Sequence, residues 1–495
     1  MSGGARSNSR GGGTERVSPA RRVAFEVLEA VRADEAYANL LLPTRISRAG
    51  LNRADAAFAT ELTYGTLRMM GFYDLVIELA ADRPTERIDP GVLDVLRLGV
   101  HQLLATRVPT HAAVYEQVAL ARKVAPKAAG FANAVLRTVS RTSAESWREL
   151  VAEGAADGDD RLARLSSHPA WIVRAFRTAL AREGRESELE ALLEADNDSP
   201  RVNLAVLPGL EGDGEGDRDG NGEEAESDDG AILEPDRYSP IGAVTDDPIG
   251  VARASGGRIR VQDEGSQLAA LALTRAAPIA PGERWLDLCA GPGGKTAVLA
   301  AEALAGGASV VANEAVPARA DLVRNAIAGV PIEVDVRVGD GRDLDLTALG
   351  APGGFDRILL DAPCTGLGAL RRRPEARWRK SPADVAELTK LQGDLFDAAV
   401  GALAPGGILA YVTCSPHTAE THGTLGAALA RSGDRVEQLD TRAVIEALSR
   451  HPLDLAGDSA TVQFWPHRHG TDAMFIALVR RTGADAAVAV DRVKP

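Results

Sequence analysis

The sequence contains 495 residues, of which 45% are hydrophobic and 25% are charged. This composition is typical of globular domains and excludes collagen-like, disulfide-rich and wholly disordered chains, and the length suggests about three domains. No stretch of about 18 apolar residues is present, and residues 1–22 lack the apolar core of a secretory signal. We therefore expect neither a membrane span nor secretion. Three widely spaced cysteines indicate a reducing cytoplasm and not a disulfide framework.

The net charge of −14 is concentrated in one segment. Residues 211–229 contain ten acids and one arginine, a net charge of −9, in a Gly-rich stretch without large apolar side chains. Such a composition cannot bury enough surface to fold. We therefore predict a disordered acidic insert over residues 211–230, most simply a solvated tether. We also predict a disordered basic tail over residues 1–16 and a second tail over residues 483–495.

Residues 17–142 predict an all-α domain, because apolar residues recur there with helical spacing. A helix start is encoded at Asp89 and Pro90, since aspartate caps a first turn and proline needs no N–H there. The two clearest apolar stripes comprise Val92, Leu93, Leu96, Val100, Leu103 and Leu104, and Ala128, Phe131, Ala132, Val135, Leu136 and Val139.

Basic residues lie between these stripes, at Arg122, Lys123, Lys127, Arg137 and Arg141. By itself this pattern fits a solvated helical face as well as an RNA-binding surface. A resemblance favours RNA. The segments that carry it are ARRVAFEVLEAV (20–31), ELTYGTLR (61–68) and FANAVLR (131–137), which are similar to the NusB-type RNA-binding domain. The resemblance implies that this domain binds structured RNA.

Residues 143–260 carry weaker signals. A polar stretch with a helical pattern is followed by a strand candidate over residues 202–207 and then by the acidic insert. We predict a connector and a small α/β subdomain that the insert interrupts, and we find no catalytic motif in it.

Residues 261–482 alternate short apolar runs with helical stretches, which predicts a doubly wound, Rossmann-like α/β domain with a mostly parallel sheet. A late antiparallel hairpin pair is expected near its end. The strand candidates are residues 284–289, 309–313, 332–338, 355–360 and 407–413, and the hairpin pair is residues 461–465 and 474–480.

In such sheets, ligands bind beyond the carboxyl ends of the strands. Reactive or ligand-binding residues follow each of the five predicted parallel strands, and all three cysteines are among them. In chain order these are the loop Cys289–Thr296, then Glu314, Asp340, Asp361–Cys364 and Cys414–Pro416. We therefore expect one edge of the sheet to hold the functional site.

The glycine-rich loop CAGPGGKT (289–296) is not a P-loop, because Cys289 stands where the first glycine is required, and it does not complete the dinucleotide fingerprint. It still lets the backbone approach a ligand at a helix N-terminus. Glu314 could accept hydrogen bonds from ribose hydroxyls. Loop and acid together predict a nucleoside-containing cofactor, with an unliganded tight turn as the alternative. They do not separate NAD, ATP and S-adenosylmethionine (SAM).

Cys364 and Cys414 end predicted strands beside this loop. C5 of cytosine is a poor nucleophile, but a thiolate that adds to C6 activates it, so a cysteine pair fits covalent catalysis of C5 methylation. Asp361 could hydrogen-bond the base at N3. A zinc site is disfavoured because there is no CxxC and no paired histidine. An inert buried thiol is the remaining alternative, and Cys289 fits it.

Four motifs resemble the RNA cytosine-5 methyltransferase superfamily: LDLCAGPGGKT (286–296), LLDAPCTGLG (359–368), VTCSP (412–416) and FWPHRHGTDAMFIALVRR (464–481). With the NusB-like domain in front, the chain is similar to the bacterial 16S rRNA cytosine-5 methyltransferase family called RsmB, Sun or Fmu. The resemblance implies a SAM-dependent methyltransferase that forms 5-methylcytosine in rRNA. It implies that Cys414 is the nucleophile, that Cys364 assists product release and that Asp361 contacts the base. The implied SAM contacts are Cys289, Ala290, Gly291, Pro292, Gly293, Gly294, Lys295, Glu314, Asp340 and Asp361.

A basic segment follows the Pro-Cys motif, with six basic residues and one acid in residues 371–380. Clustered positive charge attracts phosphates even in an acidic protein. The resemblance places this segment near the RNA, where the tryptophan could stack on a splayed base. The predicted RNA contacts are Arg371, Arg372, Arg373, Arg377, Trp378, Arg379 and Lys380.

The chain departs from the family's pattern at Gly291, where the family often has alanine, and at Glu314, where aspartate is more usual. Two other functions stay open: an RNA assembly or antitermination factor with an inactive methyltransferase domain, and a methyltransferase that acts on tRNA. We expect a cytoplasmic monomer with RNA as partner and with neither metal nor membrane.

Overall fold

A computed structural model describes residues 17–210, 225–226 and 232–483. The predicted tails, apart from Gly483, and most of the predicted acidic insert lie outside the described residues. Within the insert, Ala225–Glu226 forms the short strand β2, which pairs with β3 (Ile232–Pro235). The prediction of disorder is therefore wrong for these two residues, because they share backbone hydrogen bonds with a neighbouring strand. No helix in these described ranges is long and apolar enough to cross a membrane.

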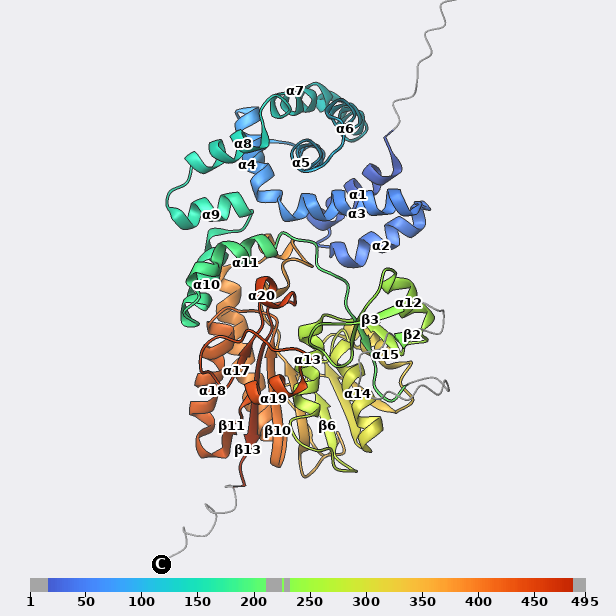
Figure 1. Cartoon of the computed structure of the whole chain (residues 1–495), viewed down its shortest axis with the longest axis vertical. Helices are drawn as coiled ribbons and strands as arrows, with labels where there is room; N and C mark the ends of the chain where they lie inside the picture. Colours follow the sequence, from blue (N-terminus) through green and yellow to red (C-terminus); the bar gives the residue numbers. More distant parts are fainter. Residues whose placement is uncertain (1–16, 211–224, 227–231, 484–495) are drawn as a thin grey trace, which may run out of the picture. The chain divides into compact units, whose positions relative to one another are not determined.

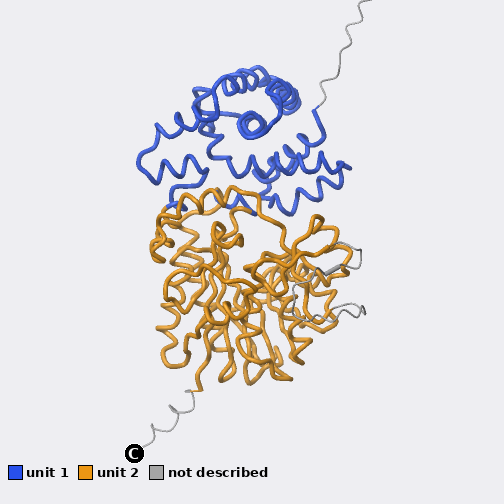
Figure 2. The backbone as a smooth tube through the Cα atoms, viewed as in Figure 1, with its two compact units in different colours: residues 1–173, 372–377 blue, residues 174–371, 378–495 orange. Residues whose placement is uncertain are grey.

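The chain divides into two compact units (Figure 2). The first comprises residues 1–173 and 372–377, and the second comprises residues 174–371 and 378–495. A hexapeptide from the C-terminal half therefore belongs to the N-terminal unit.

The first unit is helical, as predicted (Figure 1). Asp89 caps the fifth helix through bonds from the backbone N–H of Gly91 and Val92. The unit runs beyond the predicted boundary at residue 142, because Trp147 and Val151 join the same apolar core. Its helices are α1 (Pro19–Ala33), α2 (Ala38–Ala49), α3 (Arg53–Arg68), α4 (Met70–Ala81), α5 (Pro90–Ala105), α6 (Thr110–Val124), α7 (Ala129–Val139), α8 (Ala144–Glu153) and α9 (Gly158–Ser166).

The second unit begins within α10 (Ala170–Arg182) and continues through α11 (Leu189–Ala195) to a small antiparallel sheet. The strand order of this sheet is β2-β3-β4-β1-β5, and α12 (Pro248–Ala254) packs on its core. The remaining strands are β1 (Leu204–Val206), β4 (Gly242–Val244) and β5 (Ile259–Val261).

The main sheet has the order β11-β13-β10-β9-β6-β7-β8, with β12 paired to β13. The five neighbouring strands from β10 to β8 are parallel, and β13 runs antiparallel to β10, so the predicted Rossmann-like architecture is confirmed. The short strand β11 (Val436–Gln438) was not predicted. The others are β6 (Arg284–Asp287), β7 (Ser309–Glu314), β8 (Val334–Val338), β9 (Phe355–Asp361), β10 (Leu403–Thr413), β12 (Val462–Gln463) and β13 (Phe475–Arg481).

Helices cover both faces of this sheet (Figure 1). Alternate residues of one strand point to opposite faces: Leu359 belongs to one apolar core and Leu360 to the other. The first core contains α13 (Glu264–Thr274), α14 (Gly294–Gly306) and α19 (Thr441–Leu448), and the second contains α17 (Pro382–Ala402) and α18 (Thr424–Ser432). The remaining helices are α15 (Pro317–Ile327), α16 (Ala376–Arg379) and α20 (Pro466–His469).

Candidate active site

The strand order brings the predicted site loops together. β10, β9, β6 and β7 are consecutive neighbours in the sheet and run parallel. Val412 is in register with Asp361, and Asp287 is in register with Leu359, so these strands end at the same edge. The three cysteines follow three adjacent strands, β6, β9 and β10, as the sequence predicts.

The glycine-rich loop turns sharply between β6 and α14. Gly293 donates its backbone N–H to the carbonyl of Ala290 (2.7 Å) and has φ +103°, a conformation that favours glycine. A Cβ at this position would lie 2.9 Å from Val323 Cα and 2.5 Å from Ala326 Cβ. Glycine therefore serves both the turn and the close packing of α14 against α15.

Glu314, at the end of β7, is buried and holds the same loop. Its carboxylate accepts hydrogen bonds from the backbone N–H of Gly291 (3.0 Å) and Val316 (3.0 Å). Arg319 donates to the Gly291 carbonyl (2.6 Å). A Cβ at Gly291 would come within 2.4 Å of Glu314 Oε2. The two departures from the family's pattern are therefore related: the longer acid occupies space that an alanine would need.

Asp287 is 1% exposed and has an incomplete set of hydrogen bonds. Its Oδ2 accepts from Thr296 Oγ1 (2.7 Å), whereas Oδ1 has no partner among the described residues. Burial, with the charges of Asp361 and Glu314, raises the pKa of Asp287 to about 7, although the Thr296 bond and Lys295 oppose the shift. A buried acceptor without a donor fits a cationic or N–H-bearing ligand at this loop.

Lys295 and Asp361 form a partly buried ion pair, with Nζ 2.7 Å from Oδ2. Burial by itself would lower the pKa of Lys295, but the charge and hydrogen bond of Asp361 and the charge of Cys414 outweigh it, and the pKa is raised. A predicted cofactor residue and the predicted base-contacting acid are therefore bonded to each other. Lys295 also interacts electrostatically with Cys414, which contributes to the raised pKa of Lys295.

Asp340 lies apart from this buried cluster. Its carboxylate accepts several hydrogen bonds from Arg342, including Nη2 to Oδ2 at 2.5 Å, and these hold the pKa of Asp340 down at about 2. Among the predicted cofactor-binding acids, it is the most exposed to solvent.

Cys364 and Cys414 lie together, with their sulfur atoms 3.5 Å apart. This is a hydrogen-bond distance and far longer than a disulfide. The hydrogen bond with Cys414, burial, and the charges of Cys414, Glu420 and Asp361 raise the pKa of Cys364 well above its usual value. Cys364 therefore holds its proton more tightly than an isolated thiol does. Burial and neighbouring acids also raise the pKa of Cys289, which keeps that thiol protonated.

Two residues of the predicted RNA-binding segment are buried, which differs from the expectation that they contact RNA. Arg371 is 5% exposed and is paired with Asp472 (3.1 Å) and Asp263 (3.3 Å). In the helical unit, Arg377 is fully buried and donates to the carbonyls of Arg68 (2.9 Å) and Ser167 (3.2 Å).

Arg371 and Arg377 are thus corrected to structural roles, because their guanidinium groups are shielded from solvent and bonded to protein acceptors. The remaining predicted RNA contacts retain solvent exposure: Trp378 is 40% exposed, Arg373 is exposed, and Arg372, Arg379 and Lys380 are half-buried.

The sequence analysis missed Glu420 and Thr365 and assigned no role to Ser415, and these three residues form a buried hydrogen-bonded cluster next to the two thiols. Thr365 and Ser415 could have been found as the residues that follow each cysteine. Glu420 had no such signal, because a single acid after a strand usually indicates a solvated helix start.

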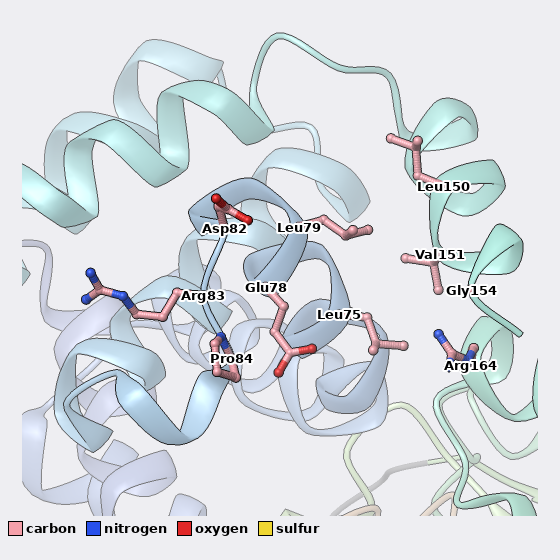
Figure 3. Close-up of a pocket in the computed structure, with 10 residues that line it drawn as sticks. All are labelled: Leu75, Glu78, Leu79, Asp82, Arg83, Pro84, Leu150, Val151, Gly154 and Arg164. Carbon is pink, nitrogen blue, oxygen red and sulfur yellow. The ribbon is translucent and has the colours of Figure 1, made fainter.

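Two further observations concern possible metal sites and pockets. Within the described ranges, no group of three or more His, Cys, Asp or Glu side chains could hold a metal ion. A pocket of about 410 Å³ lies in the helical unit, between α4 and α8 (Figure 3). Leu79, Leu150 and Arg83 are among the residues that line it, and none of its lining residues is a predicted site residue.

The open sheet, the glycine loop at the start of α14 and the acid at the end of β7 form a site for a nucleoside-containing cofactor, and the match to a methyltransferase family model defines the class: a SAM-dependent methyltransferase. The residues at the loop fit this cofactor, because the unpaired Asp287 oxygen suits its ammonium group and the Glu314 carboxylate suits its ribose.

The chain matches the family model "16S rRNA methyltransferase RsmB/F" over residues 276–480 and the NusB family model over residues 18–141. It is 50% identical to "Putative methyltransferase Rv1407" of Mycobacterium tuberculosis over 477 residues, which cover 96% of this chain and 99% of that protein. It is 34% identical to ribosomal RNA small subunit methyltransferase B of Pseudomonas putida, over 86% of this chain and 92% of the relative. The chain belongs to the RsmB/F methyltransferase family.

Among solved structures, "Crystal Structure of PH0851" superposes with a TM-score of 0.74 at 22% identity, and the match covers 94% of this chain and 99% of that one. This likeness supports the fold.

Proposed function

We propose that this protein transfers a methyl group to C5 of a cytosine in RNA, most specifically in 16S rRNA. The observation that carries the proposal is the pair of sulfur atoms, 3.5 Å apart, at the ends of β9 and β10 and next to the Lys295–Asp361 ion pair. A methyltransferase that modifies an exocyclic amine or a ribose hydroxyl needs no such pair, whereas C5 of cytosine needs a covalent nucleophile.

In this mechanism Cys414 attacks the base. The Cys414 thiolate, whose charge Lys295 balances, forms a bond from sulfur to C6, and the C5–C6 π electrons move to C5. We assign Asp361 the contact with the base at N3, where a proton held between the carboxylate and N3 would neutralise the negative charge that develops there. When bound, SAM supplies the electrophilic methyl group that C5 attacks.

Cys364 then acts in release. While Cys414 is a thiolate, its hydrogen bond and its charge keep the proton on Cys364. Once the Cys414 sulfur is bonded to C6, both influences disappear, so Cys364 can release its thiol proton to solvent and then, as a thiolate, accept the proton from C5. The electron pair of that C–H bond restores the C5–C6 double bond, and the bond from sulfur to C6 breaks. Charge therefore alternates between the two thiols.

Cofactor binding falls to the loop Cys289–Lys295 with Glu314, Asp340 and Asp361. The backbone of the loop approaches the ligand at the start of α14, where the helix dipole and N–H groups favour polar contacts. Asp287, which we did not predict, adds an acceptor.

RNA binding is supported by the helical unit and by the names of the relatives. Five basic residues of α6, the following turn, α7 and its C-terminal end are solvent-exposed: Arg122, Lys123, Lys127, Arg137 and Arg141. They can neutralise phosphates, which makes binding salt-dependent. A base must leave its stack to reach two partly buried thiols, so we expect a single-stranded or loop cytosine.

The decisive experiment is Cys414→Ala, assayed with SAM and 16S rRNA. We expect no 5-methylcytosine above background, while SAM affinity, measured by calorimetry, stays within twofold. The companion variant Cys364→Ala should accumulate a covalent RNA–protein adduct, visible as a slow band on a denaturing gel. Normal methylation by Cys414→Ala would overturn the nucleophile assignment. Methylation of tRNA but not 16S rRNA by the wild-type protein would overturn the substrate.

A further inference from the structure

Glu420 is a buried acid that the proposed mechanism does not use. It lies in a π-helical turn, Ala419–Gly423, between β10 and α18, and its side chain is fully buried. Such turns are uncommon in helices and occur often at functional sites. The turn is fixed from below by Tyr411, whose hydroxyl donates to the Glu420 carbonyl (2.6 Å).

The Glu420 carboxylate receives four hydrogen bonds. Oε1 accepts from the backbone N–H of Thr365 (2.7 Å) and from Gln392 Nε2 (3.3 Å). Oε2 accepts from the hydroxyls of Thr365 and Ser415, the latter at 2.6 Å. An ionised carboxylate has no proton to donate and about four lone-pair sites, so this donor set matches it completely.

The bonded residues are the immediate neighbours of the two thiols. Thr365 follows Cys364, and Ser415 follows Cys414. The two hydroxyl oxygens are 3.1 Å apart, and each hydroxyl has a single proton, so both cannot bond the carboxylate and each other at once. The Glu420 carboxylate thus binds both the loop that follows β9 and the loop that follows β10.

Other bonds hold the same loops less directly. Gln392 also donates to the Pro363 carbonyl (2.8 Å), and Gly368 donates its N–H to the Cys414 carbonyl (2.8 Å). These bonds are neutral, and hydrogen bonds to a charged group are about twice as strong as neutral ones. The carboxylate is therefore the strongest tie between the thiol loops.

We propose that Glu420 is a positioning residue whose buried carboxylate sets the separation of the Cys364 and Cys414 thiols. This inference rests on the proposed roles of the two cysteines. Near-attack geometry is sensitive to shifts of about 1 Å, and the charge exchange between the thiols requires that they stay in contact. Loss of the carboxylate removes the charged tie between the Thr365 and Ser415 loops and leaves only neutral bonds, such as that from Gly368 to the Cys414 carbonyl, to hold them together.

The test uses Glu420→Gln, which keeps the side-chain size but removes the charge and one acceptor oxygen. The first readout is phenylarsine oxide, a trivalent arsenical that bonds two neighbouring thiols at once and releases water. We expect its affinity for the full chain to fall at least tenfold, with Cys364→Ala defining the baseline. The second readout is methylation of 16S rRNA: kcat should fall at least tenfold, while the SAM Kd stays within twofold.

Glu302→Gln is the matched control. Glu302 is also buried and accepts bonds from Thr274 (3.2 Å) and Arg275 (2.7 Å), but it lies on α14, remote in sequence from both thiol loops. We expect this control to lower the melting temperature and leave arsenical affinity and kcat unchanged. If Glu420→Gln does not fold, Ser415→Ala can replace it. This variant removes the Ser415 hydrogen bond to the Glu420 carboxylate and should weaken arsenical binding about threefold.

The inference is overturned if Glu420→Gln, or Ser415→Ala in its place, binds the arsenical and methylates RNA like the wild type, or if its losses only parallel those of Glu302→Gln. Failure of the proposed function looks different: Cys414→Ala would then methylate RNA normally, whatever the arsenical result for Glu420→Gln.

Discussion

The two halves of the active-site edge are stabilised in different ways. At the ends of β6 and β7, a buried carboxylate oxygen of Asp287 has no hydrogen-bond partner among the described residues, and the loop that follows β6 is rich in glycine. At the ends of β9 and β10, the buried Glu420 carboxylate receives four donors from the chain itself. The first half leaves a buried acceptor for which we propose a ligand partner, whereas the second is organised by donors of the protein itself.

This difference predicts that substitutions in one half change the affinity for SAM and that substitutions in the other half change the rate of methyl transfer. Changes on the cofactor side should alter SAM binding, because the chain leaves some of its polar groups to the ligand. Changes on the thiol side should alter the chemical step at nearly constant SAM affinity. The following predictions test that division, from the largest expected effect to the smallest.

Gly293→Val should have the largest effect. A β-branched residue at φ +103° costs at least about 2 kcal/mol, and its Cβ would meet the backbone of Val323 at 2.9 Å. We expect SAM affinity to fall more than tenfold in calorimetry and the melting temperature to drop. Gly282→Ala is the control, since Gly282 has φ +88° with open space around it. It should lose only about 1 kcal/mol of stability and bind SAM normally. Equal SAM affinity for the Gly293 variant would break the comparison.

Asp287→Asn should remove a pH dependence of stability. The folded chain holds the Asp287 pKa at about 7, above the unfolded value, so the folded state binds the proton more tightly. The free energy of unfolding therefore falls as pH rises from about 4 to about 7, by up to about 1.4 kcal/mol per pH unit.

Urea unfolding across this pH range should show a shallower decline for Asp287→Asn than for the wild type, and SAM affinity should fall. Glu264→Gln is a matched variant, because burial and the charge of Asp236 also raise the Glu264 pKa to about 7. It should change the pH slope but not SAM binding. A Glu264 variant that loses SAM affinity equally would remove the special role of Asp287.

Gly291→Ala and Glu314→Asp should compensate each other. The alanine Cβ would lie 2.4 Å from Glu314 Oε2, and the shorter acid relieves that overlap. We expect Gly291→Ala alone to weaken SAM binding about tenfold, and the double variant to recover most of the loss, which gives a coupling of about 1 kcal/mol in a double-mutant cycle. Additive losses would show that the two departures from the family's pattern are unrelated.

Cys414→Ala should make Cys364 easier to alkylate. The hydrogen bond with Cys414 and the charge of Cys414 both raise the pKa of Cys364, so their removal should move the pH profile of iodoacetamide modification to lower pH. Mass spectrometry of the Cys364 peptide measures this, and Cys289→Ala should leave the profile in place. An unchanged profile in Cys414→Ala would contradict charge alternation between the thiols.

The sequence predicted the residues at the strand ends better than the buried polar contacts between them. Hydrophobic periodicity located five parallel strands and the late antiparallel pair, because each is a local pattern of about five to ten residues. Motif chemistry then located the loop at Cys289, the acid Glu314 and both reactive cysteines. Strand order places these residues on one edge, but their mutual contacts, such as Lys295 with Asp361, required the structure.

By itself, then, the sequence determined the fold class, the cofactor loop and the cysteine pair, since these depend on patterns short enough to be local. Only the tertiary structure decided what long-range partners do to charged residues. Arg371 and Arg377 read as a basic patch, yet carboxylates and carbonyls from distant segments bury both. Nothing in the sequence distinguishes Glu420 from a solvated acid, yet its carboxylate accepts hydrogen bonds from residues that follow two different strands. Burial of a charge is stable only with such partners, and partners that are far apart in the chain leave no local signal.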